Sequence, residues 1–395
     1  FCNFKNFIMK KKIVILGSTG SIGVNTLKVI GNNKKDFEIV LLSTNKNVKK
    51  IIHQAKEFKV KNIIINDSIE FKKAQKKYKR SKIKFFNKFD SIRKILGKKK
   101  IHYSMISVSG LDGLKPSIIL CKYSNNLAIV NKESIICGWN LIKNALEKNK
   151  CNFIPIDSEH YSIHSLLRGH QSNEIEKIYI TASGGPFINI PKKKFDDIKL
   201  KDALSHPNWK MGKKITIDSS TLMNKVFEVI EARNIFNIDY KKILILTHPK
   251  SYVHAIVKFN NGLSKILLHE PDMKIPIYNS LNLTNKKIRT FPLRFDTLNK
   301  LNFNEVDNKK FPLVNIINKL PKKISLFETV LITVNDYFVN KFLEKKISYK
   351  KLIFIIIKIL NMKEFQKYKK IKPKNIEDIY RLRDYVSFKM DSLSI

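Results

Sequence analysis

The sequence has few residues that break regular structure and few that form cross-links. It contains 13 glycines and 12 prolines in 395 residues, which excludes collagen-like and linker-dominated chains. The longest apolar run, 352–357 followed by Ile359 and Leu360, is interrupted by Lys358 and is too short to span a bilayer. Because the thiols show no CxxC spacing, we expect them to be reduced, in a cytoplasmic protein without a membrane segment; they are Cys2, Cys121, Cys137 and Cys151.

Acidic residues are also scarce. There are 33 Asp+Glu against 76 Lys+Arg, which gives a formal net charge of +43. Such a balance would normally indicate a nucleic acid or an acidic surface as partner. The lysines, however, are spread along the whole chain together with abundant isoleucine, asparagine and phenylalanine, all of which have A/T-rich codons. We therefore interpret the charge as base-composition bias, and keep a basic nucleic-acid-binding protein as the alternative function.

Short apolar runs alternate with helical patterns in the first part of the chain. This alternation predicts an α/β fold with a Rossmann-type, doubly wound parallel sheet over residues 9–150. We expect a central α/β catalytic domain over 151–282, a linker over 283–309 and a C-terminal helical domain over 310–395. Residues 1–8 precede the first methionine, and we leave them out of the fold. The strands expected in the first domain are 12–16, 37–42, 60–65, 103–108 and 127–130.

A glycine cluster follows the first expected strand directly and opens a helix. Glycines at this junction allow the backbone to approach a pyrophosphate at the helix N-terminus, although an ordinary strand–turn–helix junction explains the spacing too. The second strand ends without an acidic residue for a ribose 2′-hydroxyl and is followed by Lys46 and Asn47, which suit a 2′-phosphate. NADPH is thus favoured over NADH. The cluster consists of Gly17, Ser18, Thr19, Gly20, Ser21, Ile22 and Gly23.

Two carboxylates, Asp157 and Glu159, follow the apolar run 153–156. Residues two apart in an extended segment point the same way, so we expect both to converge on one point. Hard oxygen ligands are what Mg²⁺ or Mn²⁺ prefers, with Co²⁺ as a further candidate. A solvated acidic turn is the alternative.

Several polar groups lie near an expected helix start at 218–228. Asp218 or Ser219 can cap this helix, and Asn224, Lys225 and Glu228 share one of its faces. That face suits a phosphate and supplies a third carboxylate, whereas an ordinary surface helix is the alternative.

Three further loops contain candidate residues. The loop 182–187 carries Ser183 before two glycines and a proline, which also make an ordinary turn. The loop 205–212 carries Trp209 and Met211 and has the composition of a mobile lid, although a structural anchor explains the tryptophan too. His248 and His254 follow a strand end without nearby cysteines, so we expect structural or substrate contacts rather than zinc ligation.

Together these segments resemble the 1-deoxy-D-xylulose 5-phosphate reductoisomerase family. The matching strings are GSTGSIG, NKES, PIDSEH, SGGPF, HPNWKMGKKITIDSSTLMNK with the glutamate of VFEVIEA, and HPKSYVHAIV with EPDM, in the family's order across residues 9–275. The resemblance implies NADPH-dependent rearrangement and reduction of 1-deoxy-D-xylulose 5-phosphate to 2-C-methyl-D-erythritol 4-phosphate in the non-mevalonate (MEP) isoprenoid pathway. It also implies retro-aldol cleavage and re-addition before hydride transfer, one divalent cation, and a homodimer.

The resemblance further implies roles for individual residues. Asp157, Glu159 and Glu228 would ligate the cation, and Lys132, Glu159 and His254 would be catalytic. Besides the glycine cluster, Lys46 and Asn47, the cofactor would contact Asn131, Glu133 and Gly212. The phosphorylated sugar would be bound by Lys132, Ser158, Glu159, Ser183, His206, Trp209, Ser219, Asn224, Lys225 and Glu228.

One departure and one rival remain. The family's C-terminal Asn-x-x-Asn-Glu string has its nearest match in 333–336, where Asn335 precedes Asp336, which weakens the resemblance there. Another NADP-dependent dehydrogenase, such as a semialdehyde dehydrogenase, would need a nucleophilic cysteine in a polar loop. Cys137 and Cys151 have no such setting, and that reading leaves the acidic residues unexplained.

Overall fold

The structure is a computed structural model that describes residues 10–209, 211–281 and 287–393. The described residues form two compact units. The first comprises 10–131, 142–156 and 273–281, and the second comprises 132–141, 157–272 and 287–393. Helix α6 (Lys132–Lys148) contributes to both and is kinked at Gly138, where φ is −125°.

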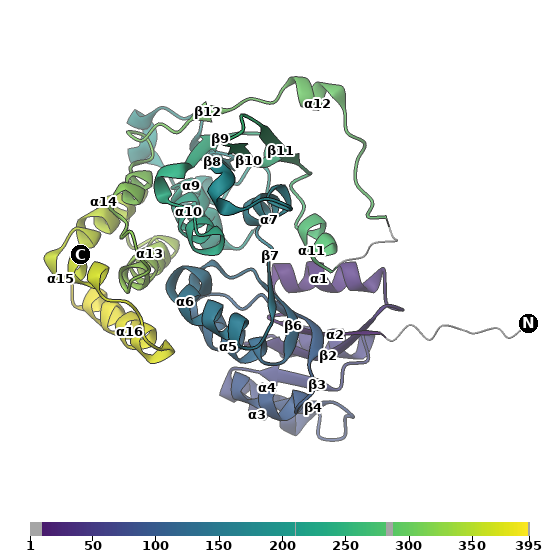
Figure 1. Cartoon of the computed structure of the whole chain (residues 1–395). Coiled ribbons are helices and arrows are strands. Elements are labelled where there is room, and N and C mark those ends of the chain that lie inside the picture. Colours follow the sequence, from purple (N-terminus) through teal and green to yellow (C-terminus); the bar gives the residue numbers. More distant parts are fainter. Residues whose placement is uncertain (1–9, 210, 282–286, 394–395) are drawn as a thin grey trace, which may run out of the picture. The chain divides into compact units, whose positions relative to one another are not determined.

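A parallel sheet forms the centre of the first unit (Figure 1). Its order in the described residues is β4-β3-β2-β1-β5-β6-β7, so the chain adds strands outward from β1 on one side and then from β5 on the other. The residues 13–16 of β1 have no exposed surface, as expected for a strand covered on both faces. The predicted doubly wound sheet is confirmed. Its strands are Lys11–Leu16 (β1), Phe37–Thr44 (β2), Asn62–Ile65 (β3), Lys84–Phe86 (β4), Ile101–Ile106 (β5), Ser124–Ile129 (β6) and Asn152–Pro155 (β7).

Helices connect these parallel strands, as the crossover between parallel neighbours requires. The compact unit extends past the expected boundary at residue 150, because β7 pairs with β6 and α11 packs against α1. The helices are Ser21–Gly31 (α1), Val48–Glu57 (α2), Ser68–Lys77 (α3), Ile92–Leu96 (α4), Leu114–Cys121 (α5) and Lys274–Ser280 (α11).

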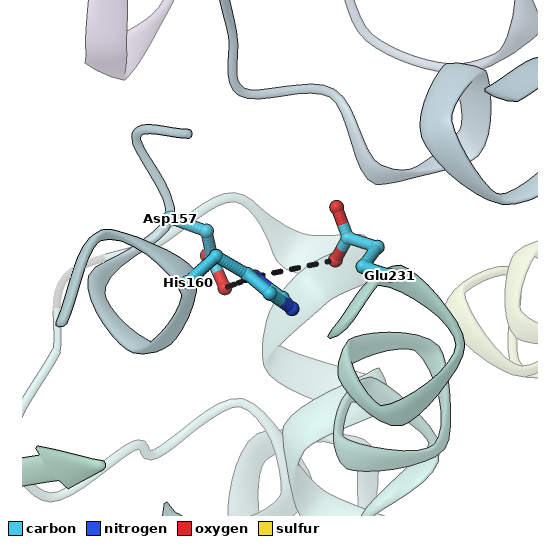
Figure 2. A group of neighbouring side chains, drawn as sticks. All are labelled: Asp157, His160 and Glu231. Atoms are coloured by element: carbon cyan, nitrogen blue, oxygen red, sulfur yellow. Dashed lines mark hydrogen bonds and ion pairs between the residues drawn. The ribbon is translucent and has the colours of Figure 1, made fainter. Parts of the chain in front are cut away.

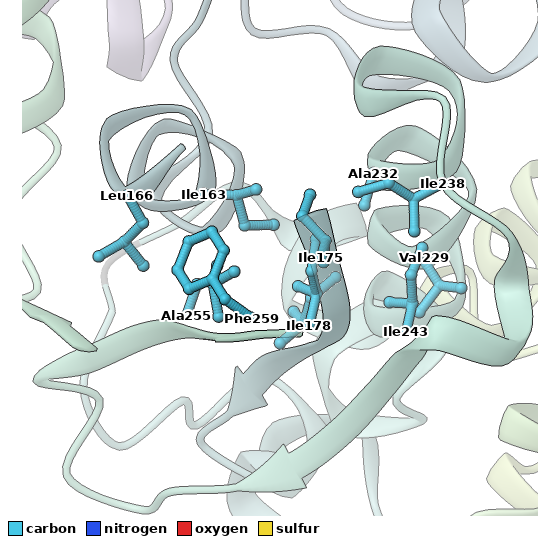
Figure 3. Packing of buried hydrophobic residues seen from close by; sticks show 12 residues of the cluster. Ile163, Leu166, Ile175, Ile178, Val229, Ala232, Ile238, Ile243, Ala255 and Phe259 are labelled. Carbon is cyan, nitrogen blue, oxygen red and sulfur yellow. The ribbon is translucent and has the colours of Figure 1, made fainter. Parts of the chain in front are cut away.

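The second unit contains a mixed sheet in the order β11-β10-β8-β9-β12. Two helices, α7 (Ser158–Leu166) and α10 (Met223–Phe236), bury apolar side chains against it (Figure 3). The cluster joins Ile163 of α7 and Val229 of α10 to strand residues such as Ile178. This packing fixes both helices on one sheet. The strands are Ile175–Ala182 (β8), Ile243–Thr247 (β9), Val253–Phe259 (β10), Ser264–Leu268 (β11) and Asn304–Glu305 (β12).

The expected linker, 283–309, contains regular structure in its described part. Helix α12 (Phe295–Asn299) is followed by β12, which pairs with β9 at the sheet edge. Residues 283–286 lie outside the described residues.

The C-terminal part is helical, as predicted. Helix α13 (Phe327–Leu343) is buried over most of its surface, because α14 and α16 pack against it. Among the described helices, none combines the length and the apolar character that crossing a membrane requires. The remaining helices are Leu200–Ala203 (α8), Lys213–Ser220 (α9), Tyr349–Leu360 (α14), Lys363–Gln366 (α15) and Ile376–Ser392 (α16).

Candidate active site

The glycine loop after β1 depends on a close backbone approach. Gly17 has φ of +79°, and a Cβ built on it would lie 2.3 Å from the carbonyl oxygen of Ser107. A Cβ on Gly23 would lie 2.5 Å from the carbonyl oxygen of Gly17. Both positions therefore require glycine, and α1 begins directly after the loop without a side-chain cap on its first turn. Such a helix start in a doubly wound fold can receive a phosphate.

Side chains of the loop are used to hold it in place. The buried Ser18 hydroxyl donates to Gln54 of α2 at 2.8 Å, so this side chain is not directed at a ligand. Thr19 shares a hydrogen bond with Thr44 at 2.8 Å, while Ser21 is exposed and Ile22 is half-buried. Any contact of Ser18 with a cofactor must come from its backbone.

Basic and amide groups lie beside this loop. Lys46 is largely exposed and reaches Asp67 at 3.7 Å, and the Asn47 side chain caps α2 by accepting from the Lys50 amide at 3.1 Å. Lys50, which the sequence reasoning missed, donates through Nζ to the Thr19 carbonyl at 2.9 Å. No local pattern distinguishes it from the other lysines of α2.

Three other expected cofactor residues make contacts of their own. Asn131 donates to the Gly110 carbonyl at 2.6 Å and so ties two loops of the first unit. Glu133 accepts from Lys214 Nζ at 2.8 Å, and Gly212 is the exposed N-cap of α9. Lys214 also reaches Asp336 at 2.7 Å, so the C-terminal departure retains a carboxylate in contact with the site helices.

The acidic residues converge, but for a different reason from the one expected. The prediction that Asp157 and Glu159 lie in an extended segment is wrong, because Asp157 is the N-cap of α7 and Glu159 lies in its first turn. Helix α10 brings Glu228 to the same place. One carboxylate oxygen from each of the three lies within 4.8 Å of the others, a donor set that fits one divalent cation.

Two lysines neutralise part of this acidic cluster. Lys132 Nζ lies 2.8 Å from Asp157 and 3.4 Å from Glu228. Lys225 Nζ lies 2.6 Å from Glu159 and 2.6 Å from Glu228. The side chains of these two lysines and three acids are buried or nearly so. A buried ion pair is favourable only if its geometry is good, because both charges have lost their contact with water.

Burial and charge shift the pKa of each acid in a different direction. Burial raises the pKa of Glu228 to about 7, and the nearby Glu159 carboxylate adds to this effect. Burial acts in the same direction on Asp157, but the Lys132 ammonium outweighs it and holds the pKa well below the usual value. A bound cation would therefore stabilise the ionised form of Glu228 more than that of Asp157.

His160 and Glu231 complete the cluster, and sequence reasoning missed both (Figure 2). His160 Nδ1 lies 3.1 Å from Asp157 Oδ2, and His160 Nε2 lies 2.9 Å from the Glu228 carbonyl oxygen. Glu231, one turn after Glu228 on α10, reaches Lys132 at 3.4 Å. Burial would lower the pKa of His160, but Glu231 and Asp157 raise it to about 9. In the sequence, only the position of Glu231 three residues after Glu228, on the same face of a helix, indicated that it could belong to the site.

The junction before α10 also differs from the prediction. Asp218 and Ser219 do not cap this helix; they lie in the last turn of α9, and Leu222 separates the two helices with φ of +60°. Asn224 lies in the first turn of α10 and donates to Glu228. Its Oδ1 is buried and has no hydrogen-bond partner among the described residues.

The expected phosphate-binding residues come from two loops, which carry Ser183 and His206, and from helices α9 and α10. His206 Nδ1 accepts from the backbone amides of Asn208 and Trp209 at 3.1 and 3.0 Å, and Nε2 lies 3.1 Å from Ser183 Oγ. Burial lowers the pKa of His206 to about 4, with Lys225 contributing, so the ring is neutral and Nε2 donates to Ser183. A Cβ on Gly185 would lie 3.0 Å from the Ser219 carbonyl oxygen, which places the loop 182–187 against the end of α9.

The expected lid contacts a buried histidine. The half-buried Trp209 ring lies 6.2 Å from that of His254, which stacks on His269 at 3.9 Å. Burial lowers the pKa of His254 to about 3, and His269 contributes. Ser158 is buried beside Glu159 and donates to it at 2.5 Å. His248 contacts the Asn302 carbonyl at 2.9 Å, a structural role.

Three family models match the chain in order. They describe 1-deoxy-D-xylulose 5-phosphate reductoisomerase over residues 13–138, its C-terminal domain over 153–236, and the DXP reductoisomerase C-terminal domain over 268–386. A protein of this name from Pelagibacter ubique is 55% identical over 387 residues, 98% of this chain and 100% of that protein. The chain belongs to the 1-deoxy-D-xylulose 5-phosphate reductoisomerase family.

Other family members agree in sequence and in structure. The reductoisomerase of Chloroherpeton thalassium is 37% identical over 86% of this chain and 88% of that protein. A crystal structure of DOX-P reductoisomerase with NADPH, fosmidomycin and magnesium superposes with a TM-score of 0.88 at 27% identity, over 97% and 98% of the two chains. The Zymomonas mobilis reductoisomerase in complex with NADPH gives 0.84 at 28% identity, over 98% and 100%. These reductoisomerases support an enzyme and do not support the nucleic-acid-binding alternative.

Proposed function

We propose that this chain converts 1-deoxy-D-xylulose 5-phosphate to 2-C-methyl-D-erythritol 4-phosphate with NADPH and a divalent cation. The observation that carries the proposal is the buried group Asp157, Glu159 and Glu228 in a chain of the reductoisomerase family. Three hard oxygen donors fit Mg²⁺ or Mn²⁺. Burial and the Glu159 carboxylate raise the pKa of Glu228, so a bound cation would stabilise its ionised form. The pathway is that of isoprenoid precursors.

The first unit would bind NADPH through the glycine loop. The backbone amides at the start of α1 would receive the pyrophosphate, because Gly17 and Gly23 keep the loop backbone open to it. Lys46 and Asn47 would contact the 2′-phosphate, with Lys50 as an added basic group. NADPH supplies the hydride. The roles of Asn131, Glu133 and Gly212 at the cofactor stay predictions.

In the second unit, the chain's own groups would hold the substrate. Lys132 and Ser158 would contact the hydroxyketone portion, and the phosphate would bind to Ser183, Ser219, Asn224 and Lys225. A bound cation supplies Lewis-acid polarisation of the carbonyl. Trp209 and Met211 would close over the substrate and exclude water, with His254 supporting the tryptophan ring.

Oxidation of NADPH by the purified protein tests this function. With 1-deoxy-D-xylulose 5-phosphate and Mn²⁺, we expect oxidation that EDTA abolishes and that Asp157→Asn or Glu228→Gln lowers at least about a hundredfold. Glu344→Gln, an exposed carboxylate of the same unit, is the matched control and should behave as wild type. Folded protein that binds NADPH but oxidises none with this substrate would contradict the proposal.

A homodimer is part of the proposal. On the sheet face opposite α7 and α10, Leu244, Tyr179, Ile256 and Ile266 lie opposite one another in successive strands and make an apolar row. Leu244 is 42% exposed and Ile266 is 46% exposed. In the described residues β11 is an edge strand, so a second copy can meet the same patch about a two-fold axis. The cytoplasmic location stays a prediction.

A further inference from the structure

Glu231 is a buried carboxylate that the proposed chemistry does not use. It lies on α10 and has only 1% of its surface exposed. Lys132 Nζ lies 3.4 Å from its Oε2, and His160 Nδ1 lies 3.9 Å from the same oxygen. An ionised carboxylate in such a position is unfavourable unless it is paired, so its contacts need an explanation.

A second cation site does not explain it. Asp157, His160 and Glu231 offer ligand atoms within 4.8 Å of one another (Figure 2). His160 Nε2 faces a carbonyl oxygen, which can only accept, and its Nδ1 faces the Asp157 carboxylate. Lys132 already lies among the same oxygens, 2.8 Å from Asp157 and 3.4 Å from Glu231. This side of the cluster is therefore occupied by the chain's own donors.

The two lysines of the cluster differ in their counterions. Both carboxylates that contact Lys225, Glu159 and Glu228, belong to the proposed ligand group. Lys132 contacts two members of that group and, in addition, Glu231, which lies outside it. A cation bound by the group would compete with both ammonium groups for the shared carboxylates. Lys225 would then be available to bind an anion such as the substrate phosphate, whereas Lys132 would remain paired with Glu231.

We propose that Glu231 is a positioning residue that holds the Lys132 ammonium beside the cation site while the cation is bound. The inference rests on the proposed function, in which Lys132 contacts the substrate. It assigns Glu231 no contact with the cation. Loss of the Glu231 charge should therefore lower kcat/KM for the substrate and leave the affinity for the cation nearly unchanged.

The test is a double-mutant cycle with Glu231→Gln and Lys132→Met, measured in two ways. Calorimetric titration with Mn²⁺ alone reports cation affinity, and steady-state kinetics with 1-deoxy-D-xylulose 5-phosphate report kcat and KM. For Glu231→Gln we expect a Kd for Mn²⁺ within about threefold of wild type and a kcat/KM lowered about tenfold or more. The double variant should be no worse than Lys132→Met by more than about threefold, because Glu231 acts through Lys132.

Two results would overturn the inference. Multiplicative losses in the double variant would show that Glu231 acts independently of Lys132. A loss of Mn²⁺ affinity equal to that of Asp157→Asn would make Glu231 a ligand. Wild-type inactivity would count against the proposed function instead, so the two failures are distinguishable. Where glutamine prevents folding, Glu231→Asp, which keeps the charge but withdraws it by one methylene, serves in the same cycle.

Discussion

Replacing Glu228 by glutamine should stabilise the cation-free protein while abolishing its response to a divalent cation. Burial raises the pKa of Glu228 from 4.5 to about 7. A carboxyl whose pKa is higher in the folded state favours folding at low pH, and this contribution is lost as the pH rises from 4.5 through about 7. At about pH 8 the ionised carboxylate therefore lowers the free energy of unfolding by about 3 kcal/mol.

Glutamine mimics the neutral form and removes this penalty. Its carbonyl can still accept from Lys225, which lies 2.6 Å from Glu228 Oε2. Its amide can donate to Asn224 Oδ1 once the Asn224 amide flips, because that oxygen has no partner among the described residues. We therefore expect the hydrogen bonds with Lys225 and Asn224 to be kept, while the longer contact from Lys132 Nζ to Oε1, at 3.4 Å, is lost. The gain in the free energy of unfolding should approach about 3 kcal/mol.

Thermal unfolding of wild type and Glu228→Gln at about pH 8, in EDTA and in Mn²⁺, measures both effects. Mn²⁺ at about 100 times its Kd should stabilise wild type by about 2.7 kcal/mol, whereas the variant should show no shift. In EDTA the variant should unfold at the higher temperature, and the difference should disappear as the pH falls below about 4.5. A variant that is less stable than wild type in EDTA, or one that Mn²⁺ stabilises equally, would refute the reasoning.

Three further predictions concern other parts of the chain. Gly17→Ala should abolish NADPH binding in a fluorescence titration, because its Cβ would lie 2.3 Å from the Ser107 carbonyl oxygen; wild-type affinity would contradict the close approach. Phe259→Ala should lower the free energy of unfolding, measured by denaturant titration, by about 3–5 kcal/mol, because the ring is 1% exposed in the core of the sheet. A loss below about 1 kcal/mol would mean that the neighbouring side chains fill the cavity. Ile266→Lys should convert the dimer to a monomer in light scattering, and a dimer that persists would exclude this face as the interface.

Local pattern was sufficient for much of the first unit. Residues 11–31 contain strand β1, the glycine loop and α1. The periodicity of the apolar residues and the local composition are enough to predict these elements. The same reasoning failed at Asp157 and Glu159, because a short polar segment after an apolar strand continues as strand or begins a helix equally well. Packing of Ile163 and Leu166 against the second sheet favours the helix, and no local signal contains that contact.

The sequence by itself determined the family, the doubly wound sheet and the identity of the acidic, basic and hydroxyl side chains that the chemistry needs. Only the tertiary structure decided how their charges are paired. Lys132 and Glu231 are 99 residues apart and Lys225 and Glu159 are 66 apart, yet each pair meets in a buried cluster. Charge pairing and pKa depend on distance and burial, which the order of residues along the chain does not specify. For this reason Glu231 looks like an ordinary helix residue until the fold places it beside Lys132.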